Sequence, residues 1–153
     1  MSNYGYRRQL ADDIENLASQ AKTALGDWLG FVSWDWYVTH TFAKDTGVMG
    51  ADSCWQAWLN SLKLTARPSK IAYVRVTEYQ KRGTPHFHSL IAGVDEIRRL
   101  TFKDLWELNG FARVEKYNHE LGASHYIGKY LTKEYTDIRF SHNLKNLTGV
   151  KHL

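Results

Sequence analysis

The spacing of apolar residues along the chain first predicts two long helices. In residues 7–29 apolar side chains recur about every 3.6 positions with polar residues between them, which is typical of an amphipathic helix. We expect this helix to pack on the rest of the domain rather than to bind a partner. A second apolar stripe, over residues 52–65, predicts another helix that ends before Pro68, since the residue before a proline avoids helical angles.

Strands are predicted where β-branched and aromatic residues cluster or alternate. These runs cover residues 36–42, 71–78, 86–93 and 111–116, with a short edge strand at 138–140. Two further helices complete the pattern. One begins near Thr101 as its N-cap and includes Leu108, and the other runs from Ser124, also as N-cap, to Lys133.

The order of these elements predicts the fold. Helix, strand, helix, strand, strand, helix, strand and helix follow one another, and the central βαββαβ part is the split-βαβ or ferredoxin-like pattern. We therefore expect an α+β fold, with a central antiparallel sheet, flanking helices on one face and an extra N-terminal helix.

The length of 153 residues suits one domain. We divide it into an N-terminal helix over 7–29, a core over 36–133 and a short tail over 134–153. No phosphate-binding Gly-x-x-x-x-Gly-Lys-Ser/Thr loop occurs, so we expect no helicase domain.

Composition narrows the setting more than the function. The net charge of +4 and the pI of about 9.1 permit a polyanionic partner without requiring one. Cys54 is the only cysteine, which excludes an intramolecular disulfide or a multi-cysteine zinc site. No apolar run is long enough to cross a bilayer, and the N-terminus lacks the apolar core of a signal peptide. We expect a cytoplasmic protein with no membrane partner.

Two histidines on one predicted strand are candidate metal ligands. His86 and His88 project from the same face, because alternate side chains of a strand do so. If the strand forms a hairpin with residues 71–78 and even residues pair with even, Glu78 joins them, whereas a slip of one residue removes it. Two imidazoles and a carboxylate suit a divalent ion and leave positions open for substrate. The alternative is a polar stripe without a metal.

The last predicted helix carries two tandem Tyr-x-x-Lys units, Tyr126 with Lys129 and Tyr130 with Lys133. Tyrosines four residues apart share a helix face. A tyrosine is a weak nucleophile at neutral pH unless a nearby ammonium or a metal-bound phosphate activates it. The alternative is that both tyrosines only pack against the sheet.

Together, three motifs resemble the HUH endonuclease superfamily, in particular rolling-circle replication initiator (Rep) proteins. Residues 37–42 look like the family's first motif, with His40 where an apolar residue is more usual. Residues 85–88 match the His-hydrophobic-His motif. Residues 126–130 match the tyrosine motif, and their two tyrosines are similar to those of single-stranded DNA phage initiators. The motifs stand in the family's order, and the resemblance covers roughly residues 36–133.

The resemblance implies a nickase that cuts single-stranded DNA through a 5′-phosphotyrosine intermediate and rejoins it. It implies a divalent metal, Mg²⁺ or Mn²⁺, on Glu78, His86 and His88. Tyr126 is expected to attack first, because it begins the first Tyr-x-x-Lys unit. Tyr130 is then expected to perform the second cleavage or the strand transfer.

The remaining expectations concern the lysines and the DNA. Lys129 and Lys133 accompany the two tyrosines in catalysis, while four residues are expected to contact DNA: Thr39, Thr41, Lys81 and Arg82. The partner is single-stranded DNA at a replication origin, with a hairpin as one form of it. A host helicase supplies unwinding, or the chain is one domain of a longer product.

Three alternatives stay open at this point. A transposase or a mobilisation relaxase would use the same chemistry. A ferredoxin-like module could bind nucleic acid without catalysis. A metal-dependent hydrolase without a covalent intermediate would leave the tyrosines with a structural role.

Overall fold

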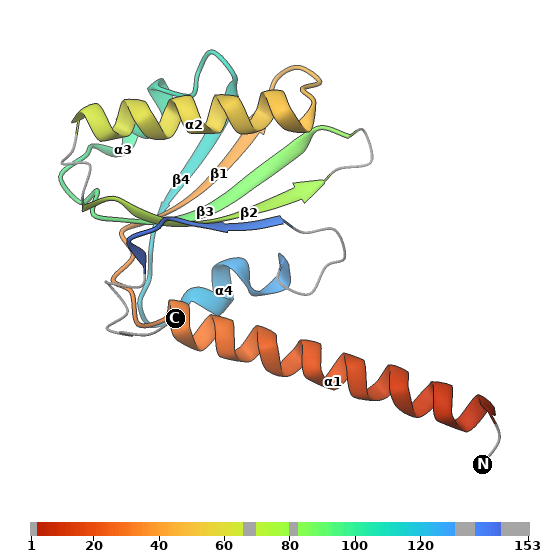
Figure 1. Cartoon of the computed structure of the whole chain (residues 1–153). Helices are drawn as coiled ribbons and strands as arrows, with labels where there is room; N and C mark the ends of the chain where they lie inside the picture. The colour runs from red at the N-terminus through yellow and green to blue at the C-terminus, as the bar shows by residue number, and fades with distance from the viewer. Residues whose placement is uncertain (1–2, 66–69, 80–82, 131–136, 145–153) are drawn as a thin grey trace.

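A five-stranded antiparallel sheet forms the centre of the computed structural model, which describes residues 3–65, 70–79, 83–130 and 137–144 (Figure 1). The strand order is β4-β1-β3-β2-β5. The strands are β1 (Trp36–Phe42), β2 (Ala72–Tyr79), β3 (Pro85–Ala92), β4 (Gly110–Lys116) and β5 (Asp137–Phe140). The predicted α+β class is confirmed, and β5 is the edge strand expected near residues 138–140.

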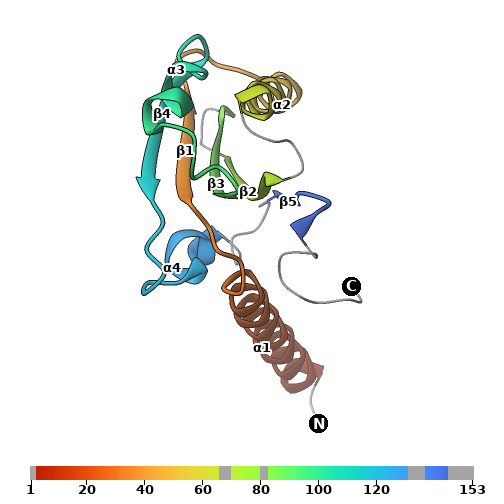
Figure 2. The ribbon, with the colours of Figure 1, turned by 90° about the vertical axis from the view of Figure 1, so that its left-hand side faces the viewer.

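Helices lie on both faces of the sheet, rather than on one face as predicted (Figures 1 and 2). Helices α2 (Val48–Thr65) and α3 (Arg99–Asp104) cover one face, because each connects two strands as a crossover. The opposite face carries α4 (Ala123–Ile127), the short 3₁₀ turn η2 (Gly128–Tyr130) and the end of α1 (Asn3–Leu29). We call the first face the α2 face and the second the α4 face.

The alternation of side chains in β1 separates these two faces. Val38 is buried on the α2 face, in a core that includes Trp55 and Trp58 of α2. Tyr37 belongs to the other cluster, with the residues of α4. Because neighbouring residues of a strand point to opposite faces, Thr39 and the other odd-numbered residues of β1 also lie on the α4 face.

The N-terminal helix α1 departs most from the prediction. Its apolar stripe is not packed on the domain, since Leu10, Ile14 and Leu17 are 47%, 59% and 64% exposed. Only the last turns dock, with Leu29 buried and Gly26 so close to α4 that a Cβ there would collide with the Ser124 hydroxyl. Figure 1 shows the rest of the helix extending away from the sheet. Apolar periodicity predicts a helix correctly, but it does not say what the stripe contacts.

Both predicted N-caps are wrong. Thr101 lies inside α3, whose N-cap is Arg98, and no side chain caps this helix. Leu108, assigned to that helix's apolar side, follows it and is fully exposed. Helix α4 is capped by Gly122, whose φ of 78° suits glycine, so Ser124 is already helical. Residues 131–136, the end of the predicted last helix, lie outside the described part of the chain.

His40 explains its own unusual place in the first motif. It is fully buried on the α2 face between the rings of Trp58 and Trp106, with centroids 4.2 and 4.5 Å away. Burial lowers its pKa to about 3, with smaller contributions from the charges of His88 and Arg75. The folded protein therefore holds His40 as a neutral ring in an apolar position.

This buried ring predicts an acid-dependent loss of stability. Below about pH 6.5 the unfolded state gains a proton on His40 that the folded state does not bind, so the free energy of unfolding falls as the pH falls. The loss from this one group is up to about 1.4 kcal/mol per pH unit. We expect His40→Leu to show a shallower loss than wild type between pH 6.5 and 4.5 in urea titrations. Parallel slopes for the two proteins would contradict this account.

Candidate active site

The pairing of β2 with β3 places the three candidate metal ligands on one face. Glu78 lies opposite His86, and Val76 lies opposite His88. The expected register of even with even residues is therefore confirmed, and the slip of one residue is excluded. All three side chains point to the α4 face of the sheet, where the tyrosine helix also lies.

His88 is the most constrained of the three. Its Nε2 is 3.6 Å from Oε2 of Glu78, and its side chain is largely buried. On the other side of the ring, the Tyr37 hydroxyl lies 3.1 Å and the Thr39 hydroxyl 3.4 Å from Nδ1. Two hydroxyls from β1 thus hold one ring nitrogen and aim the other at the carboxylate, as an outer hydrogen-bonding shell orients a metal-binding histidine.

His86 completes the set of donors but not a closed cage. It is half-buried, and burial lowers its pKa while the charge of Glu78 opposes this effect. A lowered pKa favours the neutral imidazole, which is the form that binds metals. Among the residues that the structure describes, however, no three His, Cys, Asp or Glu side chains gather closely enough to hold a metal ion. The donors have suitable chemistry, and their role as ligands stays a prediction.

Tyr130 is the tyrosine that lies against this site. Its ring stacks on that of His88, with centroids 4.2 Å apart and planes 16° from parallel. Burial raises its pKa to about 12, and the nearby charge of Glu78 contributes to the rise. The Nζ of Lys129 lies 4.9 Å from the centre of the Tyr130 ring, and the Lys129 side chain is exposed.

Tyr126 occupies a different position from the one expected. Its hydroxyl accepts a hydrogen bond from the backbone N–H of Asn118 at 2.8 Å instead of facing Glu78. Its ring packs against Tyr37 and Tyr117, with centroids 5.0 and 5.1 Å away. The helix tightens from α to 3₁₀ at Gly128, so residues four apart no longer lie on the same line along the helix. The two tyrosines therefore reach different surroundings.

The other predicted site residues are divided between contact, distance and the undescribed segments. Thr39 touches His88, whereas the hydroxyl of Thr41 donates to the backbone oxygen of Phe111 on β4. Three of the predicted residues, Lys81, Arg82 and Lys133, lie outside the described residues. Tyr37 was missed as part of the site, although its place two residues before Thr39 puts both on one strand face.

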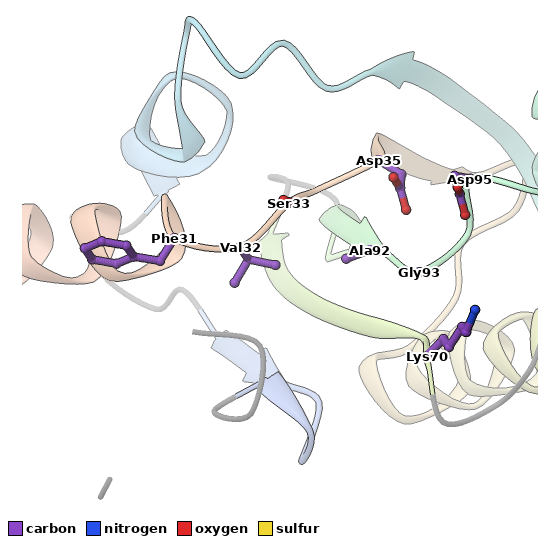
Figure 3. Close-up of a pocket in the computed structure, with 8 residues that line it drawn as sticks. All are labelled: Phe31, Val32, Ser33, Asp35, Lys70, Ala92, Gly93 and Asp95. Atoms are coloured by element: carbon purple, nitrogen blue, oxygen red, sulfur yellow. The ribbon is translucent and has the colours of Figure 1, made fainter. Parts of the chain in front are cut away.

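A hollow of about 350 Å³ adjoins the site, and its lining includes Tyr37, Tyr126 and Lys129. A larger one, of about 490 Å³, lies at the opposite end of β3, around Gly93 (Figure 3). Asp35 and Asp95 line that second hollow, but none of the predicted catalytic residues does. The candidate chemistry is therefore confined to the end of the sheet where Glu78 and the histidines lie.

Fold and site together define an α+β domain with a histidine–carboxylate–tyrosine cluster on an antiparallel sheet. The model of a replication-associated protein family, the one described by its ORF2 members, matches residues 35–135, well over half of the chain. The protein belongs to this family of replication-associated proteins, and membership implies a role in initiating rolling-circle replication and in binding origin DNA. No curated protein and no solved structure matched the chain. No helix within the described ranges is long and apolar enough to cross a membrane.

Proposed function

We propose that this protein is a metal-dependent, single-stranded DNA endonuclease and strand transferase of the HUH type. In this proposal it nicks origin DNA, stays attached through a 5′-phosphotyrosine bond, and rejoins the strand to complete a round of rolling-circle replication of a plasmid or virus. The observation that carries the proposal is the stacking of Tyr130 on His88 beside Glu78, in a chain of a replication-associated family. This arrangement combines a nucleophile with metal-binding side chains.

The proposed metal ligands are Glu78, His86 and His88. The set fits a divalent ion such as Mg²⁺ or Mn²⁺, because it joins a carboxylate to two imidazoles on adjacent, paired positions of one sheet face. Orientation of His88 by the β1 hydroxyls supports the same role. A bound divalent cation supplies charge neutralisation on the scissile phosphate and on a tyrosine oxygen as it loses its proton.

The geometry favours Tyr130 as the first nucleophile over Tyr126. The Tyr130 Oη attacks phosphorus, a phosphotyrosine bond forms, and the bond from phosphorus to the 3′ oxygen breaks. The leaving 3′ oxygen takes up a proton and becomes a free hydroxyl. Without help Tyr130 ionises poorly, since burial and the negative charge of Glu78 both raise its pKa. The ammonium of Lys129 near the Tyr130 ring favours the phenolate.

Tyr126 is proposed to act in the second transfer. It is only half-buried and lines the hollow beside the site together with Lys129. The rejoining reaction reverses the first one, because the energy of the broken phosphodiester is kept in the phosphotyrosine bond. A 3′-hydroxyl attacks that bond, releases the tyrosine, and restores the DNA backbone without ATP.

The proposal is tested by trapping the covalent intermediate. The protein is incubated with Mn²⁺ and 5′- or 3′-labelled single-stranded oligonucleotides of random sequence, so that no origin sequence has to be known in advance. We expect a protein–DNA adduct that survives a denaturing gel and carries only the 3′-labelled fragments, because the tyrosine holds the 5′ phosphate. EDTA should prevent its formation. Binding without an adduct, or metal-dependent cleavage without one, would exclude the phosphotyrosine mechanism.

A further inference from the structure

We propose that an open strip of the sheet beside the site, formed by Phe111 and Arg113 of β4 with Thr39 and Thr41 of β1, binds the single-stranded DNA that flanks the scissile phosphate. This β4 strip rests on the proposed function for the position of the cut. The ring of Phe111 stacks on an unpaired base, and Arg113 binds a backbone phosphate.

Strand register connects the strip directly to the candidate metal ligands. Thr39 lies opposite His88 on one side and opposite Arg113 on the other, so the three residues form a row across β3, β1 and β4. Thr41 lies opposite Phe111 in the next row on the same face. Neighbouring strands are about 4.8 Å apart, so Arg113 is on the order of 10 Å from His88 across the sheet. One or two nucleotides of an extended strand span this distance.

The strip is exposed, although the sheet around it is not. Phe111 is 60% exposed and the Arg113 side chain 68%, whereas Ala112 and Val114, on the other face of the same strand, are buried. Figure 2 shows β4 at the outer edge of the sheet, next to β1. The Nζ of Lys103 reaches within 5.4 Å of the centre of the Phe111 ring, which adds a positive charge at this edge. An exposed aromatic flanked by two cations is unusual for a strand that only serves the core.

These side chains match single-stranded DNA rather than a duplex. Aromatic rings stack on bases of any sequence, but only where the base face is not already paired and stacked. Basic side chains such as Arg113 and Lys103 contact phosphates and fix the path of the backbone. Arg113 now pairs with Glu115 at 2.8 Å, but that pair is exposed and its guanidinium can exchange the carboxylate for a phosphate. The negative Glu115 directs the strand toward Phe111 and Lys103.

The strip is tested by binding under conditions that prevent cleavage. Fluorescence anisotropy with fluorescein-labelled (dT)₁₂ in EDTA measures affinity for wild type and variants. We expect Phe111→Ala to weaken binding about tenfold or more, as loss of one stacked base does, and Phe111→Trp to retain it. Leu108→Ala is the matched control, because it removes an equally exposed apolar side chain outside the strip. Equal affinities of the two alanine variants, or no binding of (dT)₁₂ by wild type at low salt, would overturn the proposal.

Arg113 has a separate signature in the dependence of affinity on salt. Arg113→Gln should reduce the slope of log affinity against log salt by about 0.7, the value for one phosphate contact to a single strand. Arg98→Gln removes an exposed arginine outside the strip and should leave the slope unchanged. An unchanged slope in Arg113→Gln would exclude the phosphate contact.

Crosslinking separates the failure of this proposal from that of the proposed function. Benzoylphenylalanine introduced at position 111 should crosslink, on illumination, to a base within two nucleotides of the mapped nick. If an adduct forms but the crosslink lies elsewhere and Phe111→Ala binds normally, the strip is wrong and the nickase stands. If no adduct forms on any DNA but binding still depends on Phe111, the nickase is wrong and the binding surface stands.

Discussion

Tyr130→Phe is expected to lose the covalent protein–DNA adduct, with a fall in the rate of cleavage of at least about a thousandfold. Removal of an enzyme nucleophile typically has an effect of this size or larger. The reason lies in position, since the Tyr130 ring stacks on His88, whereas the Tyr126 hydroxyl is bound to the backbone of Asn118. The measurement is the single-turnover formation of the adduct on a denaturing gel.

Tyr126→Phe should still form that adduct but lose the second transfer, which is measured as joining of the bound fragment to an added 3′-hydroxyl strand. Tyr79→Phe is the control, because this exposed tyrosine at the end of β2 points away from the α4 face. An adduct that disappears in Tyr126→Phe and persists in Tyr130→Phe would restore the order of action predicted from sequence. Cleavage that persists in the double variant would exclude both tyrosines.

Glu78→Ala and His88→Ala are expected to lose Mn²⁺ binding and, with it, cleavage by at least about a thousandfold. Loss of charge stabilisation by a catalytic metal amounts to several kcal/mol of transition-state energy, and each 1.36 kcal/mol is a factor of ten. Isothermal titration with Mn²⁺ measures the binding directly, without DNA. Asp95→Ala is the matched control, since it removes an exposed carboxylate from the hollow at the other end of the sheet.

Tyr37→Phe grades the same experiment. It removes only the hydroxyl that contacts Nδ1 of His88 and keeps the ring that packs against Tyr126. Loss of such an outer contact should weaken Mn²⁺ binding about 10- to 100-fold, which is less than the loss of a ligand. Full Mn²⁺ affinity in His88→Ala would show that the cation, if bound, is held elsewhere.

The structure also separates the tyrosines from the pattern that suggested them. Two identical Tyr-x-x-Lys units look equivalent in the sequence, and a regular α-helix would place both tyrosines on one face. The change to a 3₁₀ turn at Gly128, together with the docking of α1 through Gly26 on Ser124, determines which side of the short helix meets the sheet. Local sequence carries no signal for such packing, because it depends on residues about 100 positions away.

The sequence by itself determined the order of strands and helices, the α+β class, and the shared face of His86 and His88. These follow from local periodicity, since a period of two places alternate residues on one side of a strand. Tertiary structure alone decided the rest. The β2–β3 register brought Glu78 to the histidines, the packing of α4 placed Tyr130 on His88, and the pairing of β1 with β4 aligned Arg113 with that site. Each depends on contacts between segments distant in the chain, where small shifts in register or helix rotation change which side chains meet.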